Sequence, residues 1–287
     1  MTKQADYLRG LLSAGPIVAA PGAPDPLTAR LVEQAGFPAI YMTGFGATAT
    51  RLGQPDIGLL TQTEMAEHAR NMVRATSIPV IADADTGYGG PSNIKRTVEE
   101  YIQAGVAALH LEDQVAPKRC GQLAGIKLMD AAESALRLKA AIAAREDDSL
   151  VIIGRTDAMP ALGADEAIDR AKRYQDAGVD LVFVDGIKKI SEVEAVAREI
   201  AGPKVVSIVD GNETTALKAS DLEEMGFSVV FYAVTTLFAA ARASAEALRH
   251  LKKNGSPAGG PAAMSYADFS DVVGLAQHQD LDESYGA

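Results

Sequence analysis

Short apolar runs rich in β-branched residues alternate along almost the whole chain with longer segments whose apolar residues recur at helical spacing. The runs predict eight β-strands, at residues 17–20, 39–43, 79–82, 108–112, 151–154, 181–184, 205–209 and 229–232. The segments between them predict eight α-helices, at 26–35, 64–75, 94–104, 131–144, 166–177, 191–200, 216–225 and 237–251. Several helices end in a glycine just before the next strand, which is typical of a left-handed helix cap.

Eight strands alternating with eight helices, in a unit of about 250 residues, predict a closed parallel (β/α)8 barrel of the TIM type. An open doubly wound sheet has the same alternation, but no Gly-x-Gly-x-x-Gly turn follows the first strand. We therefore expect a catalytic barrel over residues 1–253. The glycine- and proline-rich segment 254–263 then leads to an amphipathic tail helix expected at 264–275, within a C-terminal extension at 254–287.

Composition narrows the class of protein. The 287 residues are 47% hydrophobic, yet no run of 18 or more apolar residues predicts a membrane span, and the N-terminus lacks the apolar core of a signal peptide. A single cysteine cannot form an internal disulfide, which suits a reducing compartment. The formal charge of −11 argues against binding a nucleic-acid backbone. We expect a soluble cytoplasmic enzyme whose partner is a small molecule.

Polar residues gather where the predicted strands end, and active sites of such barrels lie at the carboxyl ends of the strands. These positions hold Thr43, Asp83, Asp85, Glu112, Asp113, Arg155, Asp157, Asp185, Ser207 and Asp210. So many acids at one mouth repel each other unless a cation lies among them. Because oxygen ligands favour hard cations, the pattern predicts Mg²⁺ or Mn²⁺ rather than zinc. None of the four histidines has metal-ligand spacing.

The only cysteine, Cys120, directly follows Lys118 and Arg119 just beyond the fourth strand. Adjacent cations favour the thiolate, so we expect a reactive sulfur rather than an ordinary buried one. A small buried hydrophobe is the alternative for a lone cysteine. Together with Asp83 and Asp85, the thiol predicts a metal-assisted site with a cysteine acid or base.

These motifs resemble those of the isocitrate lyase/phosphoenolpyruvate mutase superfamily over most of the chain. The matching segments are Asp-Ala-Asp-Thr-Gly-Tyr-Gly at 83–89, Glu-Asp-Gln at 112–114, Pro-Lys-Arg-Cys-Gly at 117–121, Arg-Thr-Asp-Ala at 155–158 and Leu-Gly-Gln-Pro-Asp at 52–56. The Lys-Arg-Cys-Gly form is similar to the lyase branch, of the 2-methylisocitrate and 2,3-dimethylmalate lyase type.

The resemblance implies a Mg²⁺ ion held by Asp85 directly and by Asp83 and Glu112 largely through water. It implies Cys120 as general acid, with Lys118 on a gating loop at 114–127, and Arg155 facing the substrate's C2 oxygen. The first base stays open among Tyr41, Asp185 and a metal-polarised water. Substrate contacts are expected from Thr43, Gly44, Phe45, Asp56, Arg119, Gly121, Gln122, Asp185 and Ser207. Relatives form dimers or tetramers by exchanging a C-terminal helix, so we expect a homodimer or homotetramer.

Three residues depart from the pattern of the methylisocitrate-type lyases. Gln122 replaces a histidine, Asp185 a glutamate and Ser207 an asparagine. We therefore expect a carbon–carbon lyase that cleaves a substituted malate or related 2-hydroxy di- or tricarboxylate into a 2-oxo acid such as pyruvate and a second acid. The alternatives are a decarboxylase or hydrolase of an oxaloacetate-like acid, a carboxyphosphonoenolpyruvate mutase-like enzyme, and a barrel that binds 2-oxo acids without turnover.

Overall fold

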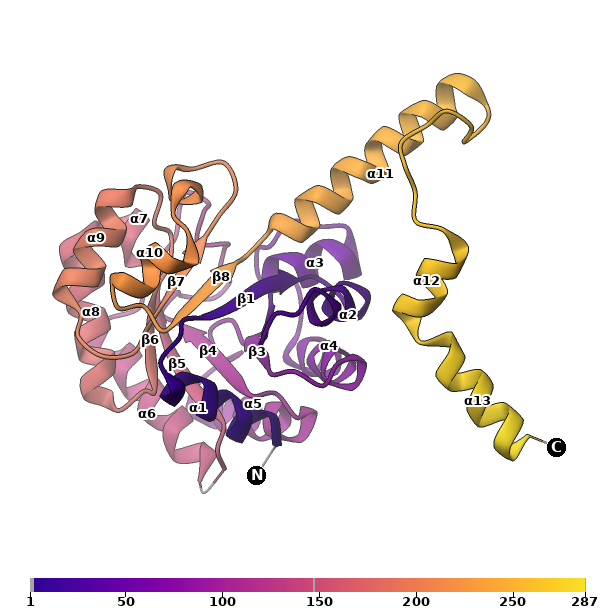
Figure 1. Ribbon diagram of the computed structural model, residues 1–287. Helices are drawn as coiled ribbons and strands as arrows, with labels where there is room; N and C mark the ends of the chain where they lie inside the picture. Colours follow the sequence, from indigo (N-terminus) through magenta and orange to yellow (C-terminus); the bar gives the residue numbers. More distant parts are fainter. Residues whose placement is uncertain (1–2, 147, 287) are drawn as a thin grey trace.

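Eight short apolar segments form parallel strands that close into a barrel in the computed structural model, which describes residues 3–146 and 148–286 (Figure 1). Each strand pairs with its neighbours in sequence, and β1 pairs with β8 through the register Val18 to Val229. The strands are β1 Val18–Ala23, β2 Ile40–Met42, β3 Val80–Asp83, β4 Ala108–Glu112, β5 Val151–Thr156, β6 Leu181–Val184, β7 Lys204–Ile208 and β8 Val229–Tyr232. The expected barrel is confirmed, and the open sheet is excluded.

Helices surround the barrel and follow the strands in turn. They are α1 Lys3–Ala14, α2 Pro26–Gln34, α3 Gly44–Leu52, α4 Gln62–Ala75, α5 Pro91–Ala104, α6 Ala131–Arg145, α7 Ala158–Leu162, α8 Ala164–Ala177, α9 Ile190–Glu199, α10 Ala219–Glu224, α11 Thr235–Asn254, α12 Tyr266–Val273 and α13 Leu275–Tyr285, with a 3-10 turn at η1 Glu213–Ala216. Every strand lies within three residues of its expected bounds.

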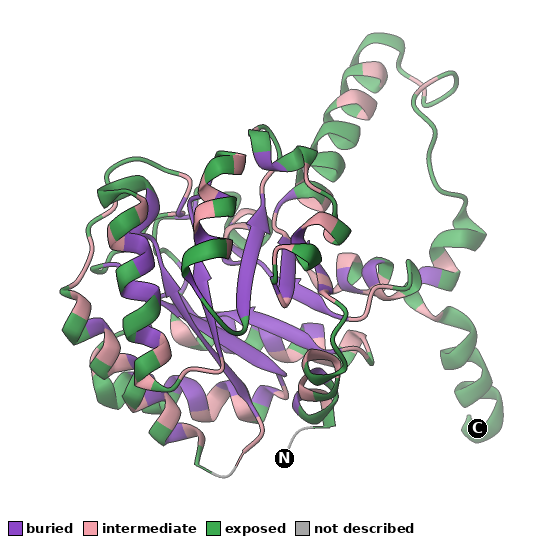
Figure 2. Ribbon diagram, turned by 60° about the vertical axis from the view of Figure 1, so that its left-hand side comes forward, coloured by how far each residue is buried: buried purple, intermediate pink, exposed green. Residues whose placement is uncertain are grey.

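The strand side chains alternate between two apolar layers because successive residues point to opposite faces of a sheet. One layer fills the barrel and includes Tyr41, Phe183 and Phe231, whose rings lie against one another. The other joins the outer face of the sheet to the helices, and Figure 2 shows buried residues along the strands and on the inward sides of the helices. Leu8 of α1 belongs to the inner layer, so α1 covers the amino end of the barrel.

Helices α1, α3 and α7 are not expected from the sequence pattern. Helix α3 opens with Gly44-Phe45-Gly46, and glycine disfavours helix. It forms because the Thr43 hydroxyl caps its first turn by accepting from the Gly46 amide, and Gly53 ends it in a left-handed conformation. The structure thereby places a helix start directly at the carboxyl end of β2.

After β8 the chain continues through α11 into the C-terminal segment beyond residue 254. None of the residues of α11 is buried, and α11 to α13 project from the barrel as an arm (Figure 1). The tail helix expected at 264–275 is present as α12. Gly274 ends it in a left-handed conformation, and a further helix that the sequence pattern does not predict, α13, follows. Helix α12 contacts α2 of the barrel. Over the described residues, no helix combines the length and the apolar character needed to cross a membrane.

Candidate active site

A cavity of about 50 Å³ lies at the carboxyl ends of the strands. It brings together most of the side chains that the sequence predicts for a site, from five strands and from the segments that follow the strands. Its lining consists of Tyr41, Thr43, Phe45, Asp56, Asp83, Cys120, Gln122, Arg155, Phe183, Asp185, Ser207, Val209, Ala233 and Val234. The lining combines polar and apolar side chains, which suits an organic acid with a hydrocarbon part.

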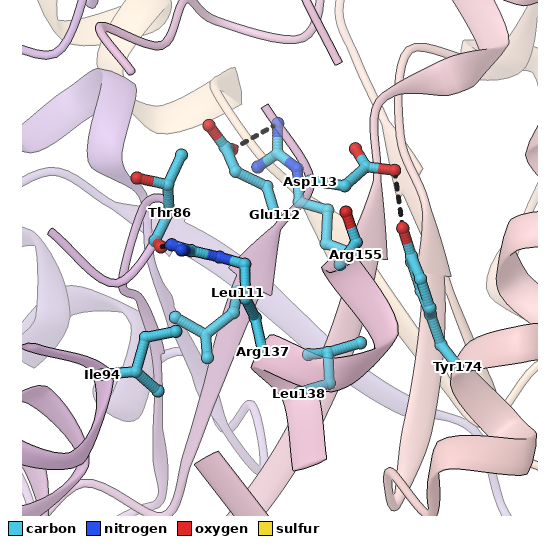
Figure 3. A pocket seen from close by; sticks show the side chains of 10 residues that line it. Thr86, Ile94, Leu111, Glu112, Asp113, Arg137, Leu138, Arg155 and Tyr174 are labelled. Atoms are coloured by element: carbon cyan, nitrogen blue, oxygen red, sulfur yellow. Dashed lines mark hydrogen bonds and ion pairs between the residues drawn. The ribbon is translucent and has the colours of Figure 1, made fainter. Parts of the chain in front are cut away.

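Arg155, at the end of β5, is buried among three carboxylates. Its Nη2 atom lies 2.7 Å from Asp185, 2.9 Å from Asp157 and 3.4 Å from Glu112. Burial disfavours the charged form, but Asp157, Asp185 and Glu112 raise the pKa of Arg155 well above its usual value. The guanidinium is therefore a fixed positive charge at the mouth, and Figure 3 shows its ion pair with Glu112.

Lys118 is the centre of a second charged cluster. Its ammonium lies 2.6 Å from Asp85 Oδ1 and 2.8 Å from Asp56 Oδ1, although the three residues are far apart in sequence. Burial raises the pKa of Asp85 to about 6, aided by repulsion from Asp83 and Asp56 and opposed by Lys118. Lys118 and Arg155 thus supply the positive charge that the acids require.

The two aspartates at the end of β3 are held by a tight turn. Asp85 has a φ of 47°, and its amide donates to Asp83 Oδ1 at 2.9 Å. A Cβ atom on Gly44 would lie 2.5 Å from Asp83 Oδ2, so only glycine lets the start of α3 approach this carboxylate so closely. Gly44, one of the predicted site residues, therefore serves the site by allowing this close contact with the Asp83 carboxylate.

Cys120 lies in the cavity but not as the thiolate that its neighbours in sequence predict. Burial raises the pKa of the Cys120 thiol to about 12. The ammonium of Lys118 is engaged by Asp56 and Asp85, and Arg119 is exposed, with its guanidinium against the Ala124 carbonyl. The expectation of a thiolate is wrong because adjacency in sequence does not bring either charge to the sulfur. A thiol that stays protonated is suited to donating a proton.

Tyr41 and His110 form a buried hydrogen-bonded pair below the cavity, with 3.2 Å between the hydroxyl and Nε2. Burial raises the pKa of Tyr41 well above 10, and it lowers the pKa of His110 to about 4. Both groups are therefore neutral, which makes Tyr41 a hydrogen-bond donor rather than a ready base. The sequence offered no sign of His110, because its role depends on a partner from another strand.

The carboxylates of Asp83, Asp85 and Glu112 supply the all-oxygen donor set that a hard divalent cation prefers. Both carboxylate oxygens of Glu112 are buried, and neither finds a hydrogen-bond partner among the described residues. Within that same part of the chain, no group of three or more acidic, histidine or cysteine side chains converges closely enough to hold an ion by itself. The donors fit an ion that keeps part of its water shell.

Two buried residues behind the lining, Gln114 and Asp157, belong to motifs noted in the sequence but were not among the predicted site residues. Asp157 is fully buried and accepts hydrogen bonds from Arg155 and from the Gln114 side chain. Burial raises the pKa of Asp157 to about 6. A Cβ atom on Gly121 would lie 2.6 Å from Asp185 and 2.7 Å from Asp157, so Gly121 presses the loop onto the Arg155 cluster.

Asp113 fixes the backbone behind this cluster. Its carboxylate accepts from the Asp157 amide, from Thr156 Oγ1 at 2.6 Å and from the Tyr174 hydroxyl at 2.7 Å, the last drawn in Figure 3. Arg170 of α8 also reaches it at 3.2 Å. Asp113 faces away from the main cavity, beside a small enclosed space of about 10 Å³ under Glu112. It is a structural anchor that links β4, β5 and α8.

Comparison with known proteins shows to which family this barrel belongs. Residues 8–252 match the family described as phosphoenolpyruvate phosphomutase. Over 279 residues the chain is 39% identical to 2,3-dimethylmalate lyase of Eubacterium barkeri, covering 97% of this chain and 96% of that protein. It is 38% identical over 281 residues to 2-methylisocitrate lyase of Bacillus subtilis strain 168, covering 98% and 92%.

A solved structure of oxaloacetate acetylhydrolase with the inhibitor 3,3-difluorooxalacetate matches with a TM-score of 0.94 and 35% identity, covering 100% of this chain and 98% of that one. The chain belongs to the phosphoenolpyruvate mutase/isocitrate lyase superfamily, as its motifs predict, and it is an enzyme of the lyase class. Members of this superfamily use divalent metal ions.

Proposed function

We propose that the protein is a Mg²⁺-dependent lyase that cleaves the C2–C3 bond of an alkyl-substituted malate to a 2-oxo acid such as pyruvate and a second carboxylic acid. The observation that carries this proposal is the presence of Cys120 in one cavity with Arg155 and strand-end acids, where burial raises the pKa of the thiol to about 12. A retro-aldol cleavage leaves a carbanion next to a carboxylate, and that carbanion needs a proton donor on its own side of the cavity.

Each step of this reaction can be assigned to a residue of the site. A base removes the proton of the C2 hydroxyl, the C2–C3 bond breaks, and its electron pair passes to C3. Cys120 then gives its proton to C3. Asp185 is the candidate base, because its carboxylate lines the cavity beside Arg155 and stands 2.7 Å from its guanidinium. Arg155 binds the C2 oxygen as negative charge develops there.

Asp83, Asp85 and Glu112 would hold the metal ion. When bound, Mg²⁺ supplies positive charge that stabilises an oxyanion at C2. Mn²⁺ prefers the same oxygen ligands and is the natural substitute. Thr43 and the amides at the start of α3, Gly44 and Phe45, face the same mouth and suit the substrate carboxylate, since a helix N-terminus favours an anion.

The charge of the cavity favours a dicarboxylate over a tricarboxylate. Among the described residues, Arg155 is the only cationic side chain in its lining, and three acids already balance it. A third carboxylate would enter without a partner, and an unpaired buried charge is costly. The apolar wall formed by Phe45, Val209, Ala233 and Val234 instead suits methyl or other alkyl branches. A substituted malate fits both features.

A second candidate function is hydrolysis or decarboxylation of an oxaloacetate-like acid. It is favoured by the structural likeness to oxaloacetate acetylhydrolase and by Ser207 and Asp185 in the cavity. That chemistry uses the same metal-held 2-oxo acid, but it needs no proton from Cys120. Phosphonate chemistry has less support, because a phosphonate carries more charge than Arg155 alone can neutralise.

We also propose that the arm formed by α11 to α13 joins copies of the chain into a homodimer or homotetramer. Many large apolar side chains of this arm are exposed, among them Phe238, Leu248, Leu251, Tyr266, Phe269 and Leu281. A single chain leaves this surface in water, which is unfavourable for a patch of this size. Light scattering of the purified protein tests the proposal, and a monomeric mass would contradict it.

The activity is tested by incubating wild type and Cys120→Ser with Mg²⁺ and a panel of substituted malates, 2-methylisocitrate and oxaloacetate, while pyruvate and oxalate release are measured. We expect turnover of an alkyl-substituted malate that Cys120→Ser loses by about 100-fold or more. Turnover of oxaloacetate alone, retained in Cys120→Ser, would replace the lyase with the hydrolase or decarboxylase.

A further inference from the structure

The loop at 114–127 lies closed over the cavity, and three attachments tie it to the barrel. Lys118 reaches Asp56 and Asp85, and the Cys120 amide donates to the Asp56 carbonyl at 3.1 Å. The third attachment is the side chain of Gln114. The first two involve groups that the proposed chemistry itself uses, whereas Gln114 does not line the cavity.

The buried amide of Gln114 uses its oxygen and both of its N–H groups. Its Nε2 atom donates to the Arg119 carbonyl and to Asp157 Oδ2, both at 2.7 Å. Its Oε1 atom accepts from the Arg119 amide at 2.9 Å. Gln114 thus holds the backbone of the residue just before Cys120 in the manner of a neighbouring β-strand.

The same side chain reaches the cluster that orients the active-site cation. Asp157 Oδ2 receives the Gln114 donor, while Oδ1 accepts from Arg155 Nη2 at 2.9 Å. One aspartate therefore connects the closed loop to the guanidinium at the mouth. Gly121 packs against the same carboxylate from the other side of Cys120.

The base of the loop is fixed independently of this connection. The Val115 amide donates to the Lys127 carbonyl at 2.7 Å, and the Met129 amide donates to the Asp113 carbonyl at 2.8 Å. These backbone bonds remain when the Gln114 side chain is changed. The amide of Gln114 is therefore separable from the anchoring of the loop ends.

We propose that Gln114 is a positioning residue that latches the loop shut through Asp157, so that placement of the Cys120 thiol and orientation of Arg155 occur together. The kinetic part of this inference rests on the proposed function. The conformational part does not, because Cys120 is the only cysteine and its accessibility reports loop closure without any substrate.

The test is the rate of Cys120 alkylation by iodoacetamide at one pH, measured in wild type, Gln114→Leu and Lys127→Ala. Leucine keeps much of the side-chain volume and removes all three hydrogen bonds, so the loop opens and the thiol becomes exposed. We expect alkylation at least tenfold faster in Gln114→Leu. Lys127 is an exposed residue at the other end of the loop, and Lys127→Ala should stay within twofold of wild type.

Asp157→Asn and the double variant test the connection to Asp157. If Gln114 acts through Asp157, the double variant is alkylated no faster than Gln114→Leu alone. The latch would be overturned if the two single substitutions each accelerated alkylation and their factors multiplied in the double variant. It would also be overturned by an unchanged alkylation rate in Gln114→Leu. Gln114→Glu, which keeps the shape but cannot donate, replaces the leucine variant if that variant fails to fold.

With a turned-over substrate in hand, Gln114→Leu should lower kcat at least tenfold while KM changes less than threefold, because the latch places the proton donor after substrate binds. Fast alkylation with an unchanged kcat would remove the positioning role. If wild type turns over no substrate of the panel, the proposed function fails, and the alkylation rates still decide whether the latch exists.

Discussion

The two ends of the barrel differ in how completely their carboxylates are paired with cations and hydrogen-bond donors. At the amino end, Asp180 accepts from Arg9, from Arg145 and from the Ile152 amide, and α1 covers the inner layer beside it. At the carboxyl end, six acids face two cations, Lys118 and Arg155, and both oxygens of Glu112 find no hydrogen-bond partner among the described residues. The acids there are Asp56, Asp83, Asp85, Glu112, Asp157 and Asp185.

This difference shows which end is built for stability and which for chemistry. Both carboxylate oxygens of Asp180 accept hydrogen bonds within the protein, so these contacts stabilise the fold. At the mouth, burial raises the pKa of Asp85, Glu112 and Asp157, so these acids cost folding free energy, and they suit an incoming cation and a substrate instead. Substitutions at the two ends should therefore have opposite consequences.

The largest expected effect is that of Asp85→Asn on activity. Turnover should fall by about a thousandfold or more, because an uncharged amide weakens the hold on the metal ion. Stability should not fall, because asparagine tolerates the left-handed backbone at this position and one of the crowded acids is removed. Steady-state kinetics and thermal unfolding check both parts.

Asp210→Asn is the matched control, since Asp210 is an exposed acid at the same end that does not line the cavity. Its turnover should remain within about threefold of wild type. A loss in Asp210→Asn as large as that in Asp85→Asn would mean that overall charge at the mouth, rather than the cavity, sets activity.

Asp180→Asn should lower the stability of the fold and leave the activity unchanged. The amide leaves Arg9 and Arg145 without their carboxylate, which costs about 1–3 kcal/mol at this partly exposed site. The unfolding midpoint should fall by about 3–8 °C, while kcat stays near wild type. Asp176→Asn, an exposed change on the preceding helix α8, should leave the midpoint unchanged. If Asp180→Asn lowered kcat without lowering the unfolding midpoint, the amino end would not serve stability alone.

A further prediction concerns the pH dependence of Cys120 alkylation, which needs no substitution. Because burial raises the pKa of this thiol to about 12, the alkylation rate of wild type should rise about tenfold per pH unit from pH 7 to 10 without levelling off. An ordinary thiol levels off above about pH 9. A plateau at pH 8–9 would show that the thiol is not buried in solution. Unfolded protein, alkylated in denaturant, gives the reference curve.

The barrel was predictable because its evidence is local and repeated. The alternation of apolar strands and amphipathic helices, with a glycine before several strands, defines eight units without knowledge of tertiary contacts. The helix α3 was not predictable in this way, because its stability comes from the Thr43 cap and from packing rather than from helix-forming residues. The same is true of α1, whose place is set by the open end of the barrel.

The sequence by itself determined the chemical inventory of the site: carboxylates at the strand ends, Arg155, and one cysteine in a flexible loop. Tertiary structure decided which of these groups meet and in which state of protonation. In the folded protein Arg119 points away from the cavity and Lys118 forms ion pairs with Asp56 and Asp85. The side chain of Gln114 donates a hydrogen bond to Asp157. The reason is physical, since pKa and hydrogen bonding depend on burial and on neighbours in space, whereas sequence adjacency fixes neither.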